Sequence, residues 1–217
     1  MKFLAILLIS SFFSQVQAKS KPVWVGTSLN GVPCVGEAPG YGYGPYDYIN
    51  PSDKKKIPVV EIFHFTKNVE LLIKGKSGTL PSDLDYTLRS IPNHHKALLS
   101  TIRYQVKLLN KLATKKLLNS PECYLQRAIN YNPKDAALYA IYGYYLTKIG
   151  RLTEAAKKYE EALKISPDNS KFEYSYSLLL VKLKEYKKAL EYAKRAYKHG
   201  KPPNGLMKKL KRLGVWK

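Results

Sequence analysis

The second half of the chain contains residues that recur at intervals of 34 positions. Ala128, Ala162 and Ala196 are 34 residues apart, and so are Pro133 and Pro167. Further pairs at the same interval are Leu146 and Leu180, Leu152 and Tyr186, and Ala155 and Ala189. A period of this length, with small residues and a terminal proline, is typical of stacked helical hairpins. Small residues let the two helices approach closely, and the proline ends the second helix. The sequence therefore predicts an array of helix pairs.

These residues resemble the tetratricopeptide repeat (TPR) family. Residues 136–169 match nearly all of the family's pattern, through Tyr139, Gly143, Leu146, Ala155, Tyr159, Ala162 and Pro167. Residues 170–203 match it less closely, residues 94–133 resemble a degenerate repeat, and residues 204–213 resemble a capping helix. The resemblance implies an all-α fold class, a TPR-like helical hairpin array of about 2.5–3 repeats plus a capping helix. It identifies no ligand, because a fold alone does not define a function.

The composition changes near residue 92. Eight prolines and eight glycines lie between Lys19 and Pro92, against five of each from Asn93 to the end. Proline and glycine oppose regular helices and central strands. Residues 19–92 are therefore predicted to form an irregular Gly/Pro/Tyr-rich N-terminal arm, and residues 93–217 a helical domain. Ser82 is expected to cap a short helix at the end of the arm, and Asn93 to cap the helix that follows.

Four short blocks of the arm are GPYDY at 44–48, HFT at 64–66, DLDYTL at 83–88 and PNHH at 92–95. They are similar to the N-terminal part of a group of exported repeat proteins of proteobacteria, and this likeness bears on the architecture only. Tyr41, Tyr43, Tyr46 and Tyr48 lie in or beside the first block. Because tyrosines bury a large area at a small entropic cost, the arm is expected to dock on the helical domain.

The first 18 residues have the three-part layout of a secretory signal peptide. Lys2 gives a positive start, residues 3–13 are apolar, and a polar stretch ends at Ala18. The apolar run is shorter than the roughly 20 residues that cross a bilayer. The predicted location is the periplasm or outside the cell, after a cut near Ala18, with no transmembrane segment in the mature chain. A buried N-terminal helix is the alternative interpretation.

The chain has two cysteines, Cys34 and Cys123. An even pair in an oxidising compartment predicts one disulfide. Two unpaired thiols that lie too far apart remain the alternative.

Positive charge is concentrated in the helical half. The chain has a formal net charge of +21. Residues 19–92 contain nine Lys and Arg against seven Asp and Glu, whereas residues 93–217 contain 27 against nine. This distribution favours acidic partners, such as an acidic protein face, anionic lipid or acidic polysaccharide. Export argues against nucleic acid as a partner. The alternative is a lysine-rich solvated surface without a ligand.

The TPR resemblance implies a groove lined by the first helix of each hairpin. The residues carried over as partner-binding are Tyr144, Lys148, Lys171, Tyr174, Leu178 and Lys182. Aromatic and lysine side chains suit an extended peptide or an acidic tail. The carboxylate-clamp subclass is excluded, because the chain has Ala140 and Tyr144 where that subclass has Lys and Asn. In the alternative interpretation, the arm fills the groove and packs against Tyr144 and Tyr174.

A second group of residues has metal-binding chemistry. The weak candidates are His64, Asp83, Asp85 and His94, because imidazole and carboxylate together can bind zinc or copper. The alternative is that these buried polar residues lock the arm to the first helix of the domain. The sequence contains no Gly-rich phosphate loop, nucleophile elbow or zincin motif, so no enzyme activity and no cofactor are predicted.

Three functions follow in order of preference. The first is a periplasmic protein-binding scaffold or adaptor that uses the TPR groove and a basic face. The second is an envelope-surface binder of anionic lipid or polysaccharide, and the third is a small metal-binding protein.

Overall fold

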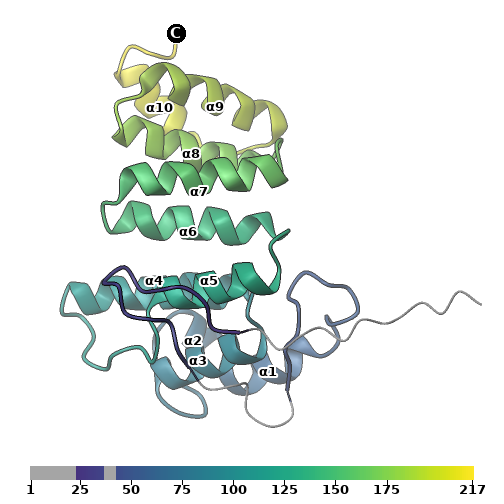
Figure 1. Cartoon of the computed structure of the whole chain (residues 1–217). Coiled ribbons are helices and arrows are strands. Elements are labelled where there is room, and N and C mark those ends of the chain that lie inside the picture. The colour runs from purple at the N-terminus through teal and green to yellow at the C-terminus, as the bar shows by residue number, and fades with distance from the viewer. Residues whose placement is uncertain (1–22, 37–42) are drawn as a thin grey trace, which may run out of the picture.

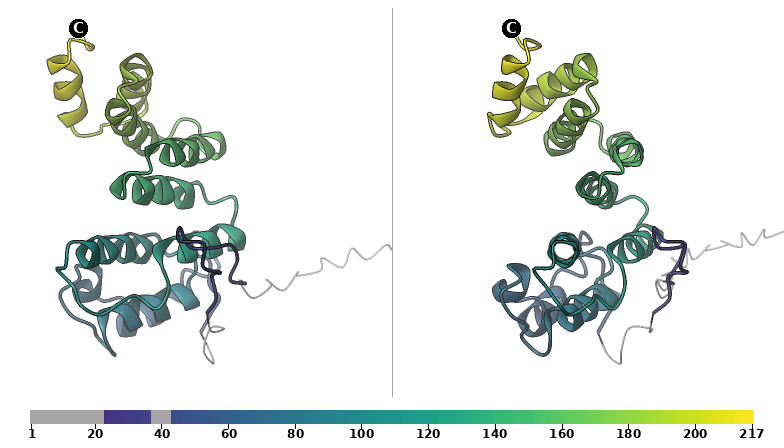
Figure 2. Two further views of the ribbon diagram at one scale, coloured as in Figure 1. Left: turned by 60° about the vertical axis from the view of Figure 1, so that its left-hand side comes forward. Right: turned by 90° about the vertical axis from the view of Figure 1, so that its left-hand side faces the viewer.

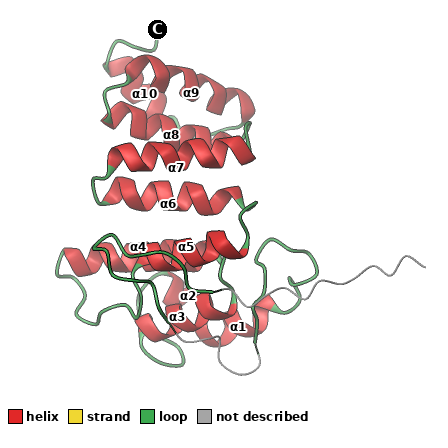
Figure 3. Cartoon of the chain, in the orientation of Figure 1, coloured by secondary structure: helices red, strands yellow, loops and turns green. Residues whose placement is uncertain are grey.

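The computed structural model describes residues 23–36 and 43–217, and the predicted signal peptide lies outside these ranges. Their regular structure is helical (Figures 1 and 3), apart from one isolated bridge between Thr27 and Pro33. The helices are α1 (Ile57–His64), α2 (Lys67–Glu70), α3 (Leu80–Ser90), α4 (His95–Leu109), α5 (Pro121–Tyr131), α6 (Ala136–Lys148), α7 (Leu152–Ile165), α8 (Ser170–Lys182), α9 (Tyr186–His199) and α10 (Gly205–Arg212). None of these helices combines the length and the apolar character needed to cross a membrane.

The predicted all-α, TPR-like hairpin array is confirmed. Helices α4 and α5, α6 and α7, and α8 and α9 form three successive pairs that stack on one another, and α10 packs against the last pair (Figure 2). Helices α1, α2 and α3 lie at the other end of the stack, beneath α4 and α5 (Figure 1). The helices that precede the repeats therefore cover the end of the array that would otherwise expose apolar surface.

Small residues set the distance within each hairpin. A Cβ atom on Gly143 would lie 2.9 Å from the ring of Tyr159 and 3.2 Å from the carbonyl oxygen of Ala155. The equivalent residue of the next hairpin is Ser177, whose hydroxyl donates to the carbonyl oxygen of Ala189 at 2.6 Å. A larger side chain at either position would force the helices apart. The predicted close approach at the small-residue positions therefore has a direct structural cause.

Two positions of the arm region differ from the prediction. Helix α3 is capped by Thr79, not by Ser82. The Thr79 hydroxyl accepts from the Ser82 backbone N–H at 3.4 Å, and the Ser82 hydroxyl accepts from the Thr79 N–H at 2.8 Å. This reciprocal capping box starts the helix earlier, at Leu80. Residues 57–90 contain α1, α2 and α3, so this part of the predicted arm is largely helical, apart from the irregular stretch at 71–79.

The N-cap of α4 also differs from the prediction and lies one residue after the predicted cap, Asn93. His94 is the N-cap, and its Nδ1 accepts from the Ala97 backbone N–H at 3.0 Å. Asn93 is buried instead, with its amide nitrogen donating to Asp47 at 2.8 Å and Asp135 at 3.1 Å. Asn93 has the capping chemistry, but its side-chain oxygen accepts from the Tyr48 backbone N–H at 2.9 Å and is therefore not available to cap α4.

The turns between paired helices offer a test of the repeat geometry. Gly150 and Lys184 are equivalent residues with left-handed backbone, at φ 83° and 62°. Glycine adopts this conformation without a Cβ clash, whereas lysine does so at a cost. The substitution Lys184→Gly should raise the free energy of unfolding by roughly 0.5 kcal/mol. The substitution Gly150→Lys should lower it by about 1 kcal/mol. Chemical denaturation measures both.

A steric clash does not contribute to the effect of Gly150→Lys, because a Cβ atom on Gly150 would meet no atom of the described chain within 4 Å. Shifts of the same sign for the two variants would contradict the equivalence of the two turns.

Candidate functional site

The first helices α4, α6 and α8 share one register. Their N-caps are His94, Asp135 and Asn169, and each helix has a lysine in its last turn, 13 residues after its cap. These lysines are Lys107, Lys148 and Lys182. Residues at the same place in the register lie on the same side of successive hairpins. The three lysines therefore follow one another along what we call the first-helix face, defined by α4, α6 and α8.

Sequence reasoning placed Lys148 and Lys182 on this face but missed Lys107. The first repeat departs from the 34-residue period, because eleven residues separate α4 from α5. Only the observed N-caps bring Lys107 into register with the others. Lys148 and Lys182 are exposed, and Lys107 is half-buried. Lysines near helix C-termini also stabilise the helix itself, so position alone does not define a binding site.

Three of the other four predicted partner-binding residues are less accessible. Tyr144 is half-buried, and the Lys148 ammonium lies 5.2 Å from the centre of its ring. Tyr174 is half-buried with its hydroxyl close to Gly205, at the start of α10. Leu178 is also half-buried and packs against the main core, whereas Lys171 is exposed. The face therefore offers mainly lysine side chains and part of one tyrosine.

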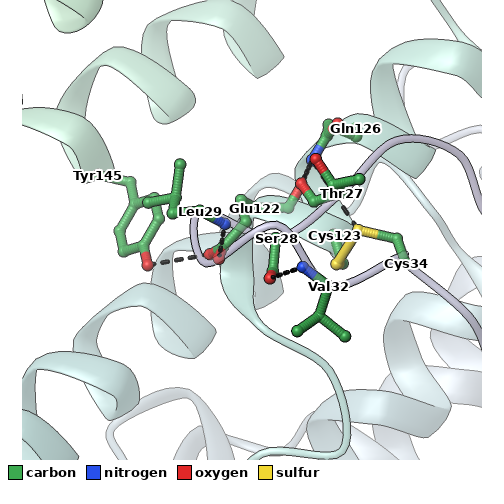
Figure 4. Close-up of a disulfide and its surroundings, with 9 residues drawn as sticks. All are labelled: Thr27, Ser28, Leu29, Val32, Cys34, Glu122, Cys123, Gln126 and Tyr145. Carbon is green, nitrogen blue, oxygen red and sulfur yellow. Dashed lines mark hydrogen bonds between the residues drawn. A yellow bond between two sulfur atoms is a disulfide. The ribbon is translucent and has the colours of Figure 1, made fainter.

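The described part of the arm lies along α5, which is a second helix (Figures 1 and 4). The backbone N–H of Leu29 donates to Glu122 Oε1 at 2.9 Å, and the hydroxyl of Tyr145 donates to Glu122 Oε2 at 3.0 Å. The amide of Gln126 donates to the carbonyl oxygen of Thr27 at 2.8 Å. Glu122 thus connects the arm to both α5 and α6. Residues 23–36 are therefore attached to α5. On the first-helix face, Tyr144 neighbours Lys148 and Tyr174 neighbours Gly205.

The predicted disulfide is confirmed. Cys34 of the arm and Cys123 of α5 are bonded, with their Cα atoms 5.4 Å apart (Figure 4). The bond adds a covalent connection beside the hydrogen bonds of Glu122 and Gln126.

A buried cation lies next to this connection. Arg127 of α5 is 1% exposed and donates to the carbonyl oxygens of Leu88 at 2.7 Å and Arg89 at 3.2 Å. These carbonyls belong to the last turn of α3. The guanidinium also lies 5.1 Å from the ring centre of Trp24 in the arm. Burial lowers the pKa of Arg127 to about 10, so the side chain remains charged at neutral pH.

A second buried polar group joins the arm to the start of α6. Asn93 lies between Asp47 and Asp135, and Asn132 donates to the other oxygen of Asp47 at 3.0 Å. His95 Nε2 is 2.7 Å from Asp135 Oδ2. Each of these side chains has a partner, as buried polar groups require. The group connects residue 47 of the arm region to the start of α6.

The weak metal candidates do not share one site. His64 Nδ1 is 2.9 Å from Asp83 Oδ1, and the ring of His64 stacks on Tyr86 with centres 3.7 Å apart. The second oxygen of Asp83 accepts from the backbone N–H groups of Lys76 at 2.6 Å and Ser77 at 3.2 Å. Asp83 therefore holds His64 and the loop before α3 together.

The remaining two candidates bind elsewhere. Asp85 accepts from the Tyr124 hydroxyl at 2.6 Å and from Arg89 Nε at 2.7 Å. His94 Nε2 is 2.9 Å from Glu61 Oε1. His64, Asp83 and Asp85 line one hollow, but in the described chain no three ligand atoms of the four candidates come together as metal ligands would.

One other group in the described chain has ligand atoms close together. Oxygen and nitrogen atoms of Asp168, Glu173 and His199 lie within 4.8 Å of one another. Arg195 Nε donates to the buried Glu173 at 2.8 Å, so a cation already neutralises this carboxylate. The group is explained as an ion-pair network.

No protein-family model matches the chain, and a comparison with curated proteins gives no match. Several solved structures of MamA are similar. One, described as the crystal structure of MamA, has 23% identity and a TM-score of 0.42, and the match covers 70% of this chain and 95% of that one. The MamA RS-1 ArsTM double mutant has 19% identity and a TM-score of 0.42, with 55% and 64% covered. MamA AMB-1 C2221 has 20% identity and a TM-score of 0.39, with 56% and 67% covered.

This chain thus spans less than two thirds of the length of the MamA RS-1 structure. The repeat fold of this chain is established by its own helix pairs and their equivalent caps.

Removing the disulfide should destabilise the protein. The double substitution Cys34→Ser and Cys123→Ser opens a connection between residues 89 positions apart. We expect the free energy of unfolding to fall by about 2–5 kcal/mol. Denaturant unfolding measures the change, and dithiothreitol should cause a similar loss in the wild type and none in the variant. An unchanged midpoint in the variant would show that the hydrogen bonds of Glu122 and Gln126 suffice.

Acidification should weaken the cap of α4. His94 is fully buried and uses both ring nitrogens as a neutral ring, since Nδ1 accepts from Ala97 and Nε2 can donate to Glu61. Burial lowers the pKa of His94, and the hydrogen bond from His94 lowers the pKa of Glu61. Below about pH 6.5 the unfolded state binds a proton at His94 more readily than the folded state does. Stability should therefore fall as pH decreases from 7.5 to 5.

The loss should have a slope of at most about 1.4 kcal/mol per pH unit for one proton. The substitution His94→Asn keeps a capping side chain without the titrating ring, so its denaturation midpoint should change less over the same interval. An equal pH dependence in both proteins would exclude His94 as the source.

Proposed function

We propose that the protein is a non-catalytic scaffold of the periplasm or cell exterior that binds a protein partner through the first-helix face. The observation that carries this proposal is the alignment of Lys107, Lys148 and Lys182 at one register position of three successive hairpins. Stacked hairpins present such positions at regular intervals along one surface. An extended segment can therefore contact all three hairpins at once.

The chemistry of the face favours an acidic segment. Exposed Lys148, Lys171 and Lys182 form no ion pair with a carboxylate in the described chain. Lys148 also lies over the ring of Tyr144, which provides a partly apolar surface beside the charge. Glu173 of α8 is buried and bonded to Arg195, so its charge does not oppose a negative ligand. Carboxylates of a partner would complement this arrangement.

The proposed location rests on two features. Residues 1–18 have the layout of a signal peptide. The bond between Cys34 and Cys123 suits an oxidising compartment, because cytosolic thiols are kept reduced.

The first-helix face can be tested by charge removal. The triple substitution of Lys107, Lys148 and Lys182 by Gln should weaken binding of an acidic protein partner by about tenfold or more, because charge-assisted contacts are lost. The partner is first captured from a native envelope extract and identified by mass spectrometry, and its affinity is then measured with purified proteins.

The matched control replaces three exposed lysines of the second helices, Lys157, Lys164 and Lys187, by Gln. This variant has the same net charge as the test variant and should retain wild-type affinity. Equal losses of affinity in the two triple variants would show that overall charge, and not the first-helix face, causes the effect. No loss of affinity in either variant would refute the proposed face.

A second function, binding to anionic lipid or polysaccharide of the envelope, is favoured by the local charge. Between Asp85 and Glu122 the sequence contains seven Lys and Arg and no Asp or Glu. A stretch of this kind attracts a continuous anionic surface.

A further inference from the structure

The segment between α4 and α5 exposes large aliphatic side chains. Residues 109–118 comprise the last residue of α4 and most of the connection to α5, and we call this segment the α4–α5 loop. It includes Leu109, Leu112 and Leu118 with exposed fractions of 61%, 74% and 62%. Single exposed leucines are common on protein surfaces, but several within ten residues require an explanation.

The loop is held in place. The Tyr104 hydroxyl donates to the carbonyl oxygen of Lys115 at 2.8 Å. The backbone N–H of Leu112 donates to the Lys107 carbonyl at 2.7 Å, which closes the end of α4. Ala113 and Leu117 are half-buried against the main core. Since these inward contacts fix the loop, the outward position of Leu112 is a property of the fold.

The arm extends the apolar surface. Val32 and Val35 are 61% and 69% exposed, and they line a hollow of about 650 Å³ together with Leu109 and Leu118. The disulfide at Cys34 keeps this part of the arm beside the loop. We define the aliphatic patch as Val32, Val35, Leu109 and Leu118, which line this hollow, together with the exposed Leu112 of the same loop, three residues after Leu109. Contiguous apolar surface of this kind marks an interaction site.

The charges around the aliphatic patch have one sign. Lys111, Lys115 and Lys116 of the loop are exposed, and none forms an ion pair with a described carboxylate. The one acidic residue lining the hollow is Glu122. Both of its oxygens accept hydrogen bonds, from Leu29 and Tyr145. The surface around the leucines is therefore positive.

We propose that the α4–α5 loop docks the protein on an anionic lipid bilayer. The leucines enter the boundary between headgroups and acyl chains, and the lysines meet the lipid phosphates. A membrane requires only apolar burial and positive charge, and the loop offers both. The seven Lys and Arg between Asp85 and Glu122, with no acidic residue among them, complement a continuous anionic surface.

This inference rests on the second of the two proposed functions and is independent of the first-helix face. Co-sedimentation with phosphatidylglycerol vesicles and with phosphatidylcholine vesicles tests it. The full chain is purified after export and its N-terminus is determined, because uncleaved residues 3–13 would bind vesicles themselves. We expect binding to the anionic vesicles that weakens at high salt, and little binding to the zwitterionic ones.

Two pairs of variants locate the contact. Leu112→Ser with Leu118→Ser should weaken vesicle binding about tenfold. The control pair, Ile165→Ser in α7 and Leu213→Ser just after α10, changes residues that are 41% and 42% exposed and should leave binding unchanged. Lys111, Lys115 and Lys116 replaced by Gln should also weaken it about tenfold, unlike the same change at Lys148, Lys171 and Lys182. Circular dichroism and thermal unfolding confirm that each variant is folded.

Absence of binding to anionic vesicles would overturn the proposal, and so would equal effects of the loop and first-helix lysine variants. Binding that survives the leucine substitutions would show a purely electrostatic attraction and would also overturn it. If vesicles do not bind and the loop variants lose a purified protein partner, the aliphatic patch is a protein-docking surface. The scaffold function is tested separately, because it predicts that partner binding is lost in the first-helix variants and not in the loop variants.

Discussion

The buried guanidinium of Arg127 holds together the end of the array from which the rest of the structure extends. It donates to carbonyls at the end of α3, lies on Trp24 of the arm, and belongs to α5 of the first hairpin. A charge without these partners would be costly to bury. The arm, α3 and α5 must therefore assemble together, and the disulfide of Cys34 and Cys123 preserves the same junction covalently.

The parts that could be predicted from the sequence are those with a repeating physical cause. Gly143 and Ser177 must be small because a neighbouring helix occupies the space a larger side chain would need. Such a constraint recurs with every hairpin, so it is visible as a period in one sequence. The pairing of Cys34 with Cys123 was predictable for a different reason, because two cysteines leave one possible bond.

The parts that could not be predicted depend on competition between distant residues. Asn93 and His94 are adjacent and both can cap a helix, but only the fold brings the Tyr48 backbone N–H to the side-chain oxygen of Asn93 and leaves the cap to His94. Lys107 joins the first-helix face only because α4 begins at that cap. The fold likewise gives His64 and His94 different carboxylate partners, Asp83 and Glu61, which are distant from them in the sequence.

The irregular first repeat links these observations to function. A regular hairpin turns within a few residues, as at Gly150, whereas α4 and α5 are separated by the α4–α5 loop. A shorter turn would leave no place for Leu112 and Leu118 on the surface and would remove three lysines. The hydrogen bond of Tyr104 and the core contacts of Leu117 hold the longer loop in place. Because the repeat pattern does not require this segment, its apolar and basic surface is better explained by a ligand than by the stability of the array.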